Sequence, residues 1–221
     1  MTTPESLSRR ALDTLDALVR RCPELAACHG SLEATATLVV RCFSAGGRLY
    51  LCGNGGSHAD CLHIAGELVK SYSAARPLSV SRRQALTVAR LPDGALLAGS
   101  LQAGLPAVAL GTNGAVSSAI GNDLGPEFGL AQELEALGCT GDVMLVLSTS
   151  GASRNVVLAT QVACSLGMGI VAFTGAAGAS SPVGRLAHVV VAAPGSSTNE
   201  VQEQHSRMYH ALCGAIEAEL F

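Results

Sequence analysis

The chain has few charged and few aromatic side chains. Charged residues make up 14% of its 221 residues, against roughly 25% in an average soluble protein, and this sparse charge predicts contact between subunits. Aromatic residues make up 3%, and the net charge is −3. The sequence therefore offers neither rings on which bases could stack nor a basic surface for phosphates, and we expect no nucleic-acid partner.

Long apolar runs and paired cysteines are also missing. No run approaches the ~18 apolar residues of a membrane span, and residues 1–10 are polar where a signal peptide is apolar. The eight cysteines include no C-x-x-C pair, and most lie in apolar stretches. These absences predict a soluble cytoplasmic protein with no membrane partner, whose cysteines are buried thiols.

The sequence does contain a repeated order of apolar strand, glycine-rich turn and helix. Apolar residues at helical spacing predict two N-terminal helices at 5–21 and 31–44, separated by Pro23 and Gly30. Continuous apolar runs predict parallel strands that are covered on both faces. The expected strands are 48–52, 107–110, 143–148, 169–174 and 189–193, and the expected later helices are 124–137, 152–166 and 200–220.

This pattern predicts a single α/β domain over residues 1–221, with a three-layer α-β-α doubly wound parallel sheet. Residues 1–45 supply the N-terminal helices. Residues 76–105 form an insertion, in which two apolar stretches around a turn at 92–94 predict two short helices. We expect a folded cap at a subunit boundary, with arginines near the entrance of the site. These arginines are Arg76, Arg82, Arg83 and Arg90.

Ligands of such sheets bind beyond the carboxyl ends of the strands. The first strand leads into the loop Gly53-Asn-Gly-Gly-Ser57, whose backbone N–H groups can approach an anion at the start of a helix. His58 stands where a dinucleotide fingerprint has its third glycine, and no lysine follows as in a Walker A loop. The loop is a candidate phosphate site, and a tight turn that needs glycine at positive φ is the alternative.

A second candidate loop follows the strand at 143–148. Residues 148–153 read Ser-Thr-Ser-Gly-Ala-Ser and place four hydroxyl groups around one glycine. Ser153 can also cap the next helix, but a capped turn needs only one hydroxyl. Because neutral donors can hold a single phosphate without arginine, the two loops together indicate a sugar phosphate.

His63 and Glu67 stand four residues apart in the apolar helix after the first loop, so they share a helix face. A buried imidazole and a buried carboxylate need partners, which can be each other, a metal or a substrate. A satisfied structural pair and a functional pair both remain open. The last helix adds Gln202, His205 and His210, of which we expect His205 at the surface or an interface.

Together these residues resemble the sugar isomerase (SIS) domain family, and within it the phosphoheptose isomerase branch. The resemblance covers nearly the whole chain apart from 76–105, and it implies a flavodoxin-like fold. The segments that carry it are Cys52–Ser57, the His63-x-x-x-Glu67 helix, Gly121–Asp123, Gly141–Val143, Ser148–Ser153 and Val201–Glu203.

The resemblance implies one zinc ion per active site, bound by His63, Glu67, Gln202 and His210. It implies isomerisation of sedoheptulose 7-phosphate to D-glycero-D-manno-heptose 7-phosphate through an enediol, with Glu67 as base, His210 as acid partner and zinc polarising the C2 carbonyl. The substrate- and phosphate-binding residues that it implies are Asn54, Gly55, Gly56, Ser57, Asp123, Ser148, Thr149, Ser150, Ser153 and Gln202.

Gln202 and His210 are separated by about 12 Å of helix. One ion between them requires both side chains to lean inward, or ligands from two subunits, and the resemblance implies a homotetramer. Asn199 departs from the acidic residue common at its position, and compact isomerases lack the insertion.

Two other functions stay open. One is a non-catalytic SIS module that binds a sugar phosphate or a protein partner, although the four retained ligands favour an enzyme. The other is an aminosugar-phosphate isomerase or etherase, although many of those enzymes have tandem SIS domains.

Overall fold

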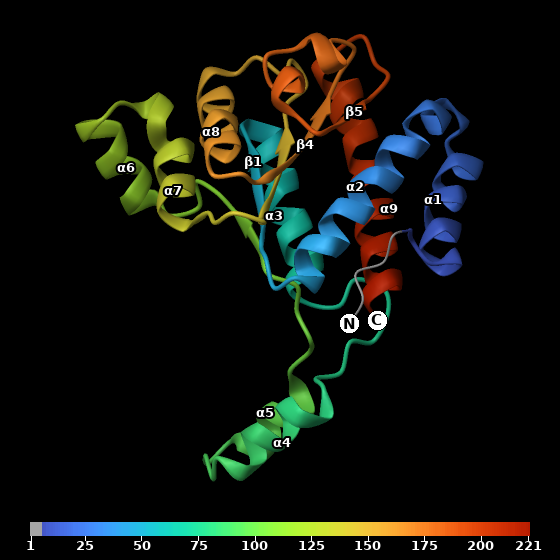
Figure 1. Cartoon of the computed structure of the whole chain (residues 1–221), viewed down its shortest axis with the longest axis vertical. Helices are drawn as coiled ribbons and strands as arrows, with labels where there is room; N and C mark the ends of the chain where they lie inside the picture. The colour runs from blue at the N-terminus through green and yellow to red at the C-terminus, as the bar shows by residue number, and fades with distance from the viewer. Residues whose placement is uncertain (1–5) are drawn as a thin grey trace.

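A computed structural model describes residues 6–221, so residues 1–5, with the start of the helix predicted at 5–21, lie outside the described residues. Five parallel strands form one sheet in the order β2-β1-β3-β4-β5 (Figure 1). This arrangement confirms the predicted α/β class and the parallel sheet. The strands are β1 (Leu49–Gly53), β2 (Ala107–Ala109), β3 (Val143–Leu147), β4 (Gly169–Thr174) and β5 (Val189–Ala192).

Helices cover both faces of the sheet (Figure 1). All residues of β1 and β3 are buried, which explains why their sequences are continuously apolar rather than alternating. One face packs against α1 (Arg9–Arg21), α2 (His29–Ser44), α3 (Gly55–Val69) and α9 (Thr198–Leu220). The other face packs against α7 (Gly129–Leu137) and α8 (Arg154–Ser165), with α6 (Gly114–Asp123) beside α7.

The helix boundaries differ from the predicted ones in two places. Gly30 lies in the first turn of α2 rather than between helices, and a 3-10 helix, η1 (Pro23–Cys28), joins α1 to α2. The predicted helix at 124–137 covers only η2 (Pro126–Phe128) and α7, and α6 precedes it. Small residues and two glycines give α6 little apolar periodicity, so its start depends on the cap that Asn113 provides. Two further short 3-10 helices are η3 (Gly178–Ser180) and η4 (Gly184–Leu186).

The strand order brings the two candidate loops together. From β1 the chain adds β2 on one side and β3, β4 and β5 on the other, so the order reverses between β1 and β3. Gly53, the last residue of β1, pairs with Leu147, the last residue of β3. Residues 53–57 and 148–153 therefore start side by side at the switch point, where doubly wound sheets form their binding crevice.

The insertion forms the two predicted helices, α4 (Val80–Val88) and α5 (Gly94–Ser100). They pack against each other and project from the body (Figure 1). At their root, Pro77 and Gln102 form an antiparallel bridge. The insertion begins after the end of α3, and α3 has by then run back from the carboxyl edge of the sheet. Helices α4 and α5 therefore do not cover the binding crevice of their own chain. Within one chain the insertion lies away from the crevice, and Arg76 is buried. The predicted cap at a subunit boundary stays a prediction.

The cysteine prediction holds in part. Five cysteines are buried, but Cys139 and Cys164 are exposed and Cys22 is half-buried. Cys139 follows α7, and Cys164 lies in the last turn of α8. Both helices are in an outer layer, where an apolar stretch of sequence does not ensure burial of each of its residues. Separately, no helix within residues 6–221 is long and apolar enough to cross a membrane.

Candidate active site

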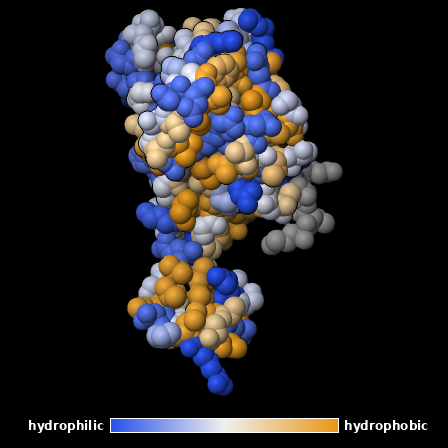
Figure 2. Space-filling view, turned by 90° about the vertical axis from the view of Figure 1, so that its left-hand side faces the viewer, coloured by the Kyte–Doolittle hydropathy of each residue, from blue (hydrophilic) through white to orange (hydrophobic). Residues whose placement is uncertain are grey.

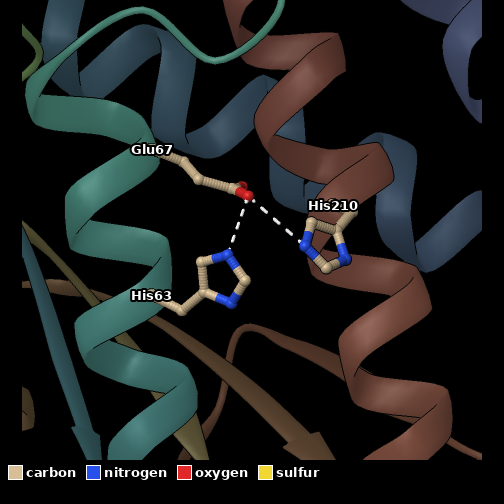
Figure 3. A group of neighbouring side chains, drawn as sticks. All are labelled: His63, Glu67 and His210. Atoms are coloured by element: carbon tan, nitrogen blue, oxygen red, sulfur yellow. Dashed lines mark ion pairs between the residues drawn. The ribbon is translucent and has the colours of Figure 1, made fainter.

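Helices α3 and α9 bring three of the candidate residues together (Figure 3). Glu67 Oε1 lies 3.2 Å from His63 Nε2 and 3.3 Å from His210 Nε2. The side chains of His63 and His210 are 52% and 34% exposed, whereas that of Glu67 is 11% exposed. The cluster therefore has a buried carboxylate as its floor and opens to solvent on the side of the histidines.

The cluster fits a divalent metal ion. One ligand atom from each of His63, Glu67 and His210 lies within 4.8 Å of the other two. Glu67 Oε2 is buried and has no hydrogen-bond partner among residues 6–221, which costs free energy unless a cation or proton compensates. Two imidazole nitrogens and a carboxylate oxygen are the donor set of many catalytic zinc sites.

Tyr209 and Asp60 support His63 on the side away from Glu67. The Tyr209 hydroxyl lies 3.0 Å from His63 Nδ1 and donates a hydrogen bond to Asp60 Oδ1 at 3.2 Å. Burial raises the pKa of Tyr209 to about 12 and also raises the pKa of Asp60. Neither residue was among the predicted site residues, although Asp60 stands three residues before His63 and so shares its helix face.

Two further residues pack around the cluster. The Tyr72 ring stacks on His210, with the ring centroids 6.2 Å apart and the planes at 22°. Burial raises the pKa of the Cys213 thiol well above its usual value, and the neighbouring Glu67 carboxylate raises it further. Cys213 therefore faces Glu67 as a neutral thiol and does not add a negative charge.

Arg76 ties the end of α3 to α9. Its guanidinium donates to the carbonyl oxygens of Leu68 at 2.8 Å and Glu67 at 3.3 Å, and its Nε donates to Glu217 Oε1 at 2.6 Å. Burial alone would raise the pKa of Glu217, but hydrogen bonds from residues 72–74 outweigh it and hold the pKa at about 2. This buried ion pair satisfies carbonyls of the last turn of α3 and fixes the position of Glu67.

Gln202 lies against the first candidate loop. Its amide Nε2 donates to Ser57 Oγ at 3.4 Å, and a Cβ on Gly56 would come within 3.0 Å of the same amide. Glycine at position 56 therefore allows α9 to approach the loop closely. Gln202, on α9, therefore contacts the start of α3 at Ser57, which stands six residues before His63.

The helices that follow the two loops begin without a side-chain cap. Ser153 stands at the N-cap of α8, as predicted, but the predicted capping bond is wrong, because no side-chain cap hydrogen bond forms there within the described chain. The same holds for Asn54 at the N-cap of α3. Gly55 and Gly151 have φ of +53° and +60°, so both turns also need glycine. Uncapped N–H groups of two adjacent helices leave room for an anion.

The remaining loop residues lie around these helix starts. Ser148 is 6% exposed and accepts a hydrogen bond from the Gly151 N–H at 3.2 Å. Thr149 and Ser150 line a cavity of about 230 Å³ together with residues 196–198. This cavity lies at the carboxyl edge of the sheet, where a phosphate group would meet both hydroxyls and helix N-termini.

Two residues predicted to contact the substrate, Asn54 and Asp123, are not free at the site within one chain. Asn54 is hydrogen-bonded to another side chain, and Asp123 lies on the other face of the sheet. The Asn54 amide exchanges two hydrogen bonds with Asn155, at 2.9 and 2.8 Å, and no motif in the sequence points to Asn155. Asp123 ends α6 in the layer on the other face of the sheet. Its carboxylate accepts a hydrogen bond from Asn122 at 2.8 Å.

His205 is buried, so the prediction of a surface or interface position is wrong. The side of α9 that carries Val201, His205 and Met208 packs into the core. His205 Nε2 lies 3.2 Å from the Thr174 carbonyl oxygen, and burial lowers the pKa of His205 to about 4. The neutral imidazole therefore links α9 to the end of β4.

A cavity of about 860 Å³ between α1 and α9 reaches His210 from the opposite side to the sheet. Three arginines line it, namely Arg10, Arg21 and Arg207. Arg207 pairs with Glu24 at 2.9 Å. Glu217 also lines the cavity, so charges of both signs lie beside the cluster on this side.

Curated relatives of this chain carry the name phosphoheptose isomerase. The chain is 36% identical to the phosphoheptose isomerase of Roseiflexus sp. (strain RS-1) over 227 aligned residues, which cover 100% of this chain and 99% of the relative. It is 34% identical to the phosphoheptose isomerase of Akkermansia muciniphila, covering 89% of each chain.

Solved structures and a family profile give the same result. The phosphoheptose isomerase structure from Francisella tularensis has a TM-score of 0.70 at 26% identity, and covers 93% of this chain and 97% of its own. The structure from Neisseria gonorrhoeae has a TM-score of 0.67 at 28% identity, and covers 94% of this chain and 91% of its own. The SIS domain profile matches residues 14–90 and 91–175. The chain therefore belongs to the SIS domain family.

Proposed function

We propose that this protein is a metal-dependent isomerase that interconverts sedoheptulose 7-phosphate and D-glycero-D-manno-heptose 7-phosphate. The observation that carries the proposal is the cluster of His63, Glu67 and His210. Helix α3, which holds two of these residues, begins at the first candidate loop, and that loop starts beside the second one at the carboxyl edge of the sheet. Relatives that carry the name phosphoheptose isomerase and match nearly the whole chain support the choice of sugar.

The substrate would lie along α3, with its phosphate at the two loops. Ser57, Ser148, Thr149, Ser150 and Ser153 would donate to the phosphate, together with N–H groups at Gly55 and Gly56. From Ser57 to His63 the helix rises about 9 Å, which is comparable with the extended carbon chain of a heptose. A phosphate at the helix starts would thus leave C1 and C2 of the sugar near the cluster. Asn54, at the N-cap of α3, would contact the substrate at the phosphate end after releasing Asn155.

We assign the metal to His63, Glu67 and His210. Gln202 is the proposed fourth ligand, and its amide, which contacts Ser57 at 3.4 Å in this structure, would have to move away from that serine to reach the ion. Bound zinc would supply a Lewis acid that polarises the C2 carbonyl and stabilises the enediolate oxygen. Glu67 Oε1 faces both histidines, whereas Oε2 is buried. Oε1 is therefore the oxygen that lies between the two histidines, and a cation held by this carboxylate would also offset the burial of Oε2.

Glu67 and His210 would carry the proton transfer. Glu67 removes the C1 proton of the ketose, the electron pair of that C–H bond forms the C1–C2 double bond, and His210 protonates the C2 oxygen. In the second half, the enediol loses the proton from O1 to His210, C1 becomes the aldehyde, and Glu67 returns a proton to C2. A ring nitrogen that binds the ion cannot also carry a proton, so His210 would exchange protons through the ring nitrogen that the ion leaves free. His210 lies 3.3 Å from Glu67 Oε1, and in this way it would share the work of a base that also holds a metal.

We propose that copies of this chain assemble around the site, as a homotetramer. On α3, Leu62 and Val69 are 47% and 54% exposed on either side of the half-exposed His63. Large apolar side chains beside a polar site predict a partner that covers them. A second copy could also bring Asp123 to the sugar, because within one chain α6 lies across the sheet.

Conversion of the sugar tests the proposal. The purified protein, supplied with zinc, is incubated with sedoheptulose 7-phosphate and followed by proton NMR for the anomeric signals of the aldose. We expect conversion, and at least a 100-fold slower rate for Glu67→Gln, because general base catalysis contributes about 10²–10⁴-fold. Glu135→Gln, a carboxylate change on α7, is the control. Binding of the sugar phosphate without conversion would favour the non-catalytic module instead.

A further inference from the structure

We infer that Asp60 and Tyr209 act as positioning residues that hold His63 as the tautomer protonated on Nδ1, so that the unprotonated Nε2 faces Glu67 and His210. This inference rests on the proposed metal-dependent function. It concerns a hydrogen-bonded chain that joins α3 to α9 beside the cluster, and it assigns a role to two residues that do not themselves contact the ion.

Asp60 determines which group donates in each hydrogen bond of this series. An ionised Asp60 carboxylate can only accept hydrogen bonds, so the single proton of the Tyr209 hydroxyl points to Asp60 Oδ1, at 3.2 Å. The contact of 3.0 Å between Tyr209 and His63 Nδ1 must then have His63 as the donor. Ser206 Oγ donates to the same phenol oxygen at 3.4 Å, which fills its second lone pair.

This arrangement determines what His63 offers to the cluster. A neutral imidazole carries one proton, and a proton on Nδ1 leaves a lone pair on Nε2. Figure 3 shows one ring nitrogen of His63 directed at Glu67 and the other directed away from it. Nε2 and Glu67 Oε1, 3.2 Å apart, are then both electron-rich and attract a cation between them.

A hydrogen bond of this kind also orients the ring. Metal-bound histidines usually donate their other N–H to a carboxylate or a carbonyl, and loss of that partner typically lowers metal affinity about 10–100-fold. Here the Tyr209 hydroxyl lies between the Asp60 carboxylate and the His63 ring, and it hydrogen-bonds to both. His63 is half-exposed, so packing alone does not fix its orientation.

The test measures both the tautomer and the metal affinity in the whole chain. Long-range ¹⁵N–¹H NMR of the histidines, with the His63 signals assigned from a His63→Gln variant, reports which ring nitrogen carries the proton. Zinc affinity is measured by competition with a chromophoric chelator. Tyr209→Phe removes only the hydroxyl. Tyr50→Phe is the matched control, because it removes a phenol that donates to the Leu137 carbonyl oxygen at 2.7 Å, away from the cluster.

We expect the Nδ1–H form in the metal-free protein, its loss in Tyr209→Phe, and about 10–100-fold weaker zinc binding in Tyr209→Phe than in Tyr50→Phe. Asp60→Asn should weaken zinc binding in the same direction. Wild-type affinity and an unchanged tautomer in Tyr209→Phe would overturn the inference. Failure of the unmodified protein to bind zinc would contradict the proposed metal site, and the NMR measurement would then still decide whether Tyr209 sets the tautomer.

Discussion

At the scale of single residues, the proposed phosphate site and the metal cluster differ in which polar groups have hydrogen-bond partners within the described chain. The hydroxyls of residues 148–153 lie at helix starts without side-chain caps, so their polar groups are available to an anion. Glu67, by contrast, has one oxygen between two histidines and one buried without a partner. The loops are suited to bind and the cluster is suited to react.

Loss of the loop hydroxyls should weaken binding more than chemistry. Ser150→Ala and Ser153→Ala should each raise the KM for the phosphorylated ketose more than they lower kcat, because the phosphate is remote from C1 and C2. Each lost hydrogen bond to a charged group costs about 1.5–3 kcal/mol. Steady-state kinetics measure this, with Ser165→Ala at the far end of α8 as control. A fall in kcat at unchanged KM would contradict a phosphate site.

His205 predicts a dependence of stability on pH. Its pKa falls from 6.5 to about 4 on folding, so between these values the unfolded chain binds more protons. Stability is complete above pH 6.5 and declines as the pH falls toward 4, by up to about 3 kcal/mol. In His205→Gln this part of the decline should be absent, as measured by urea unfolding at each pH. Equal slopes for wild type and variant would contradict the burial of a neutral imidazole, and His58→Gln, at a half-buried position, serves as control.

At the scale of elements, the account depends on how α3 and α9 are held together. Arg76 connects the last carbonyls of α3 to Glu217 of α9 and lies over the Phe221 ring, 4.9 Å from its centroid. Both charges of the pair are buried. The insertion therefore begins with a structural anchor for the cluster and not with a surface arginine.

Removal of one partner of this pair should be costly. Arg76→Ala leaves the Glu217 carboxylate buried without its cation, which typically destabilises a protein by about 3–5 kcal/mol. Arg82→Ala, on the projecting helix α4, should stay within about 0.5 kcal/mol of wild type. Urea denaturation compares the two variants. Equal stability of both would show that the hydrogen bonds from residues 72–74 suffice for Glu217.

The helices α4 and α5 expose large apolar side chains, which are visible on the lower part of Figure 2. These side chains are Val80, Val88, Leu91, Leu96 and Leu101, each at least 50% exposed. We expect deletion of residues 78–101, with Pro77 joined to Gln102 through Gly-Ser, to leave the core folded, because α4 buries no residue in the described chain. Assembly mass or activity should fall. A deletion variant with wild-type kinetics and an unchanged mass in light scattering would contradict a role in the assembly.

Elements with strong local patterns could be predicted from the sequence. The continuous apolar run at 143–147 and the glycine turns at 53–57 and 148–153 were sufficient to place β1, β3 and the crevice. The spacing of His63 and Glu67 predicted a shared helix face. Helix α6 was missed because small residues give no apolar period, and only the cap from Asn113 marks its start.

Contacts between distant segments could not be predicted in this way. Tyr209 and His63 are 146 residues apart, and nothing near Tyr209 in the sequence indicates a contact with α3. Arg76 looked like a surface arginine because its partner, Glu217, comes from the other end of the chain. Burial of His205 depends on the angle at which α9 crosses the sheet, and local composition does not determine that angle.

At the scale of the whole molecule, one sheet topology accounts for the separation of the two functions. The strand order reverses between β1 and β3 and forms a crevice at the carboxyl edge, where we propose that the phosphate binds. From there α3 and α9 run along the same face and present His63, Glu67 and His210 further down. A phosphorylated sugar chain can therefore contact both regions at once, which a single loop could not provide.

The most direct test of this account is the conversion of sedoheptulose 7-phosphate in D₂O by the zinc-loaded protein, followed by NMR. We predict D-glycero-D-manno-heptose 7-phosphate with solvent deuterium at C2, because the proton would pass through Glu67 and His210 at a cluster open to water. Unchanged ketose after prolonged incubation, or an aldose with no deuterium at C2, would contradict enediol chemistry at this cluster.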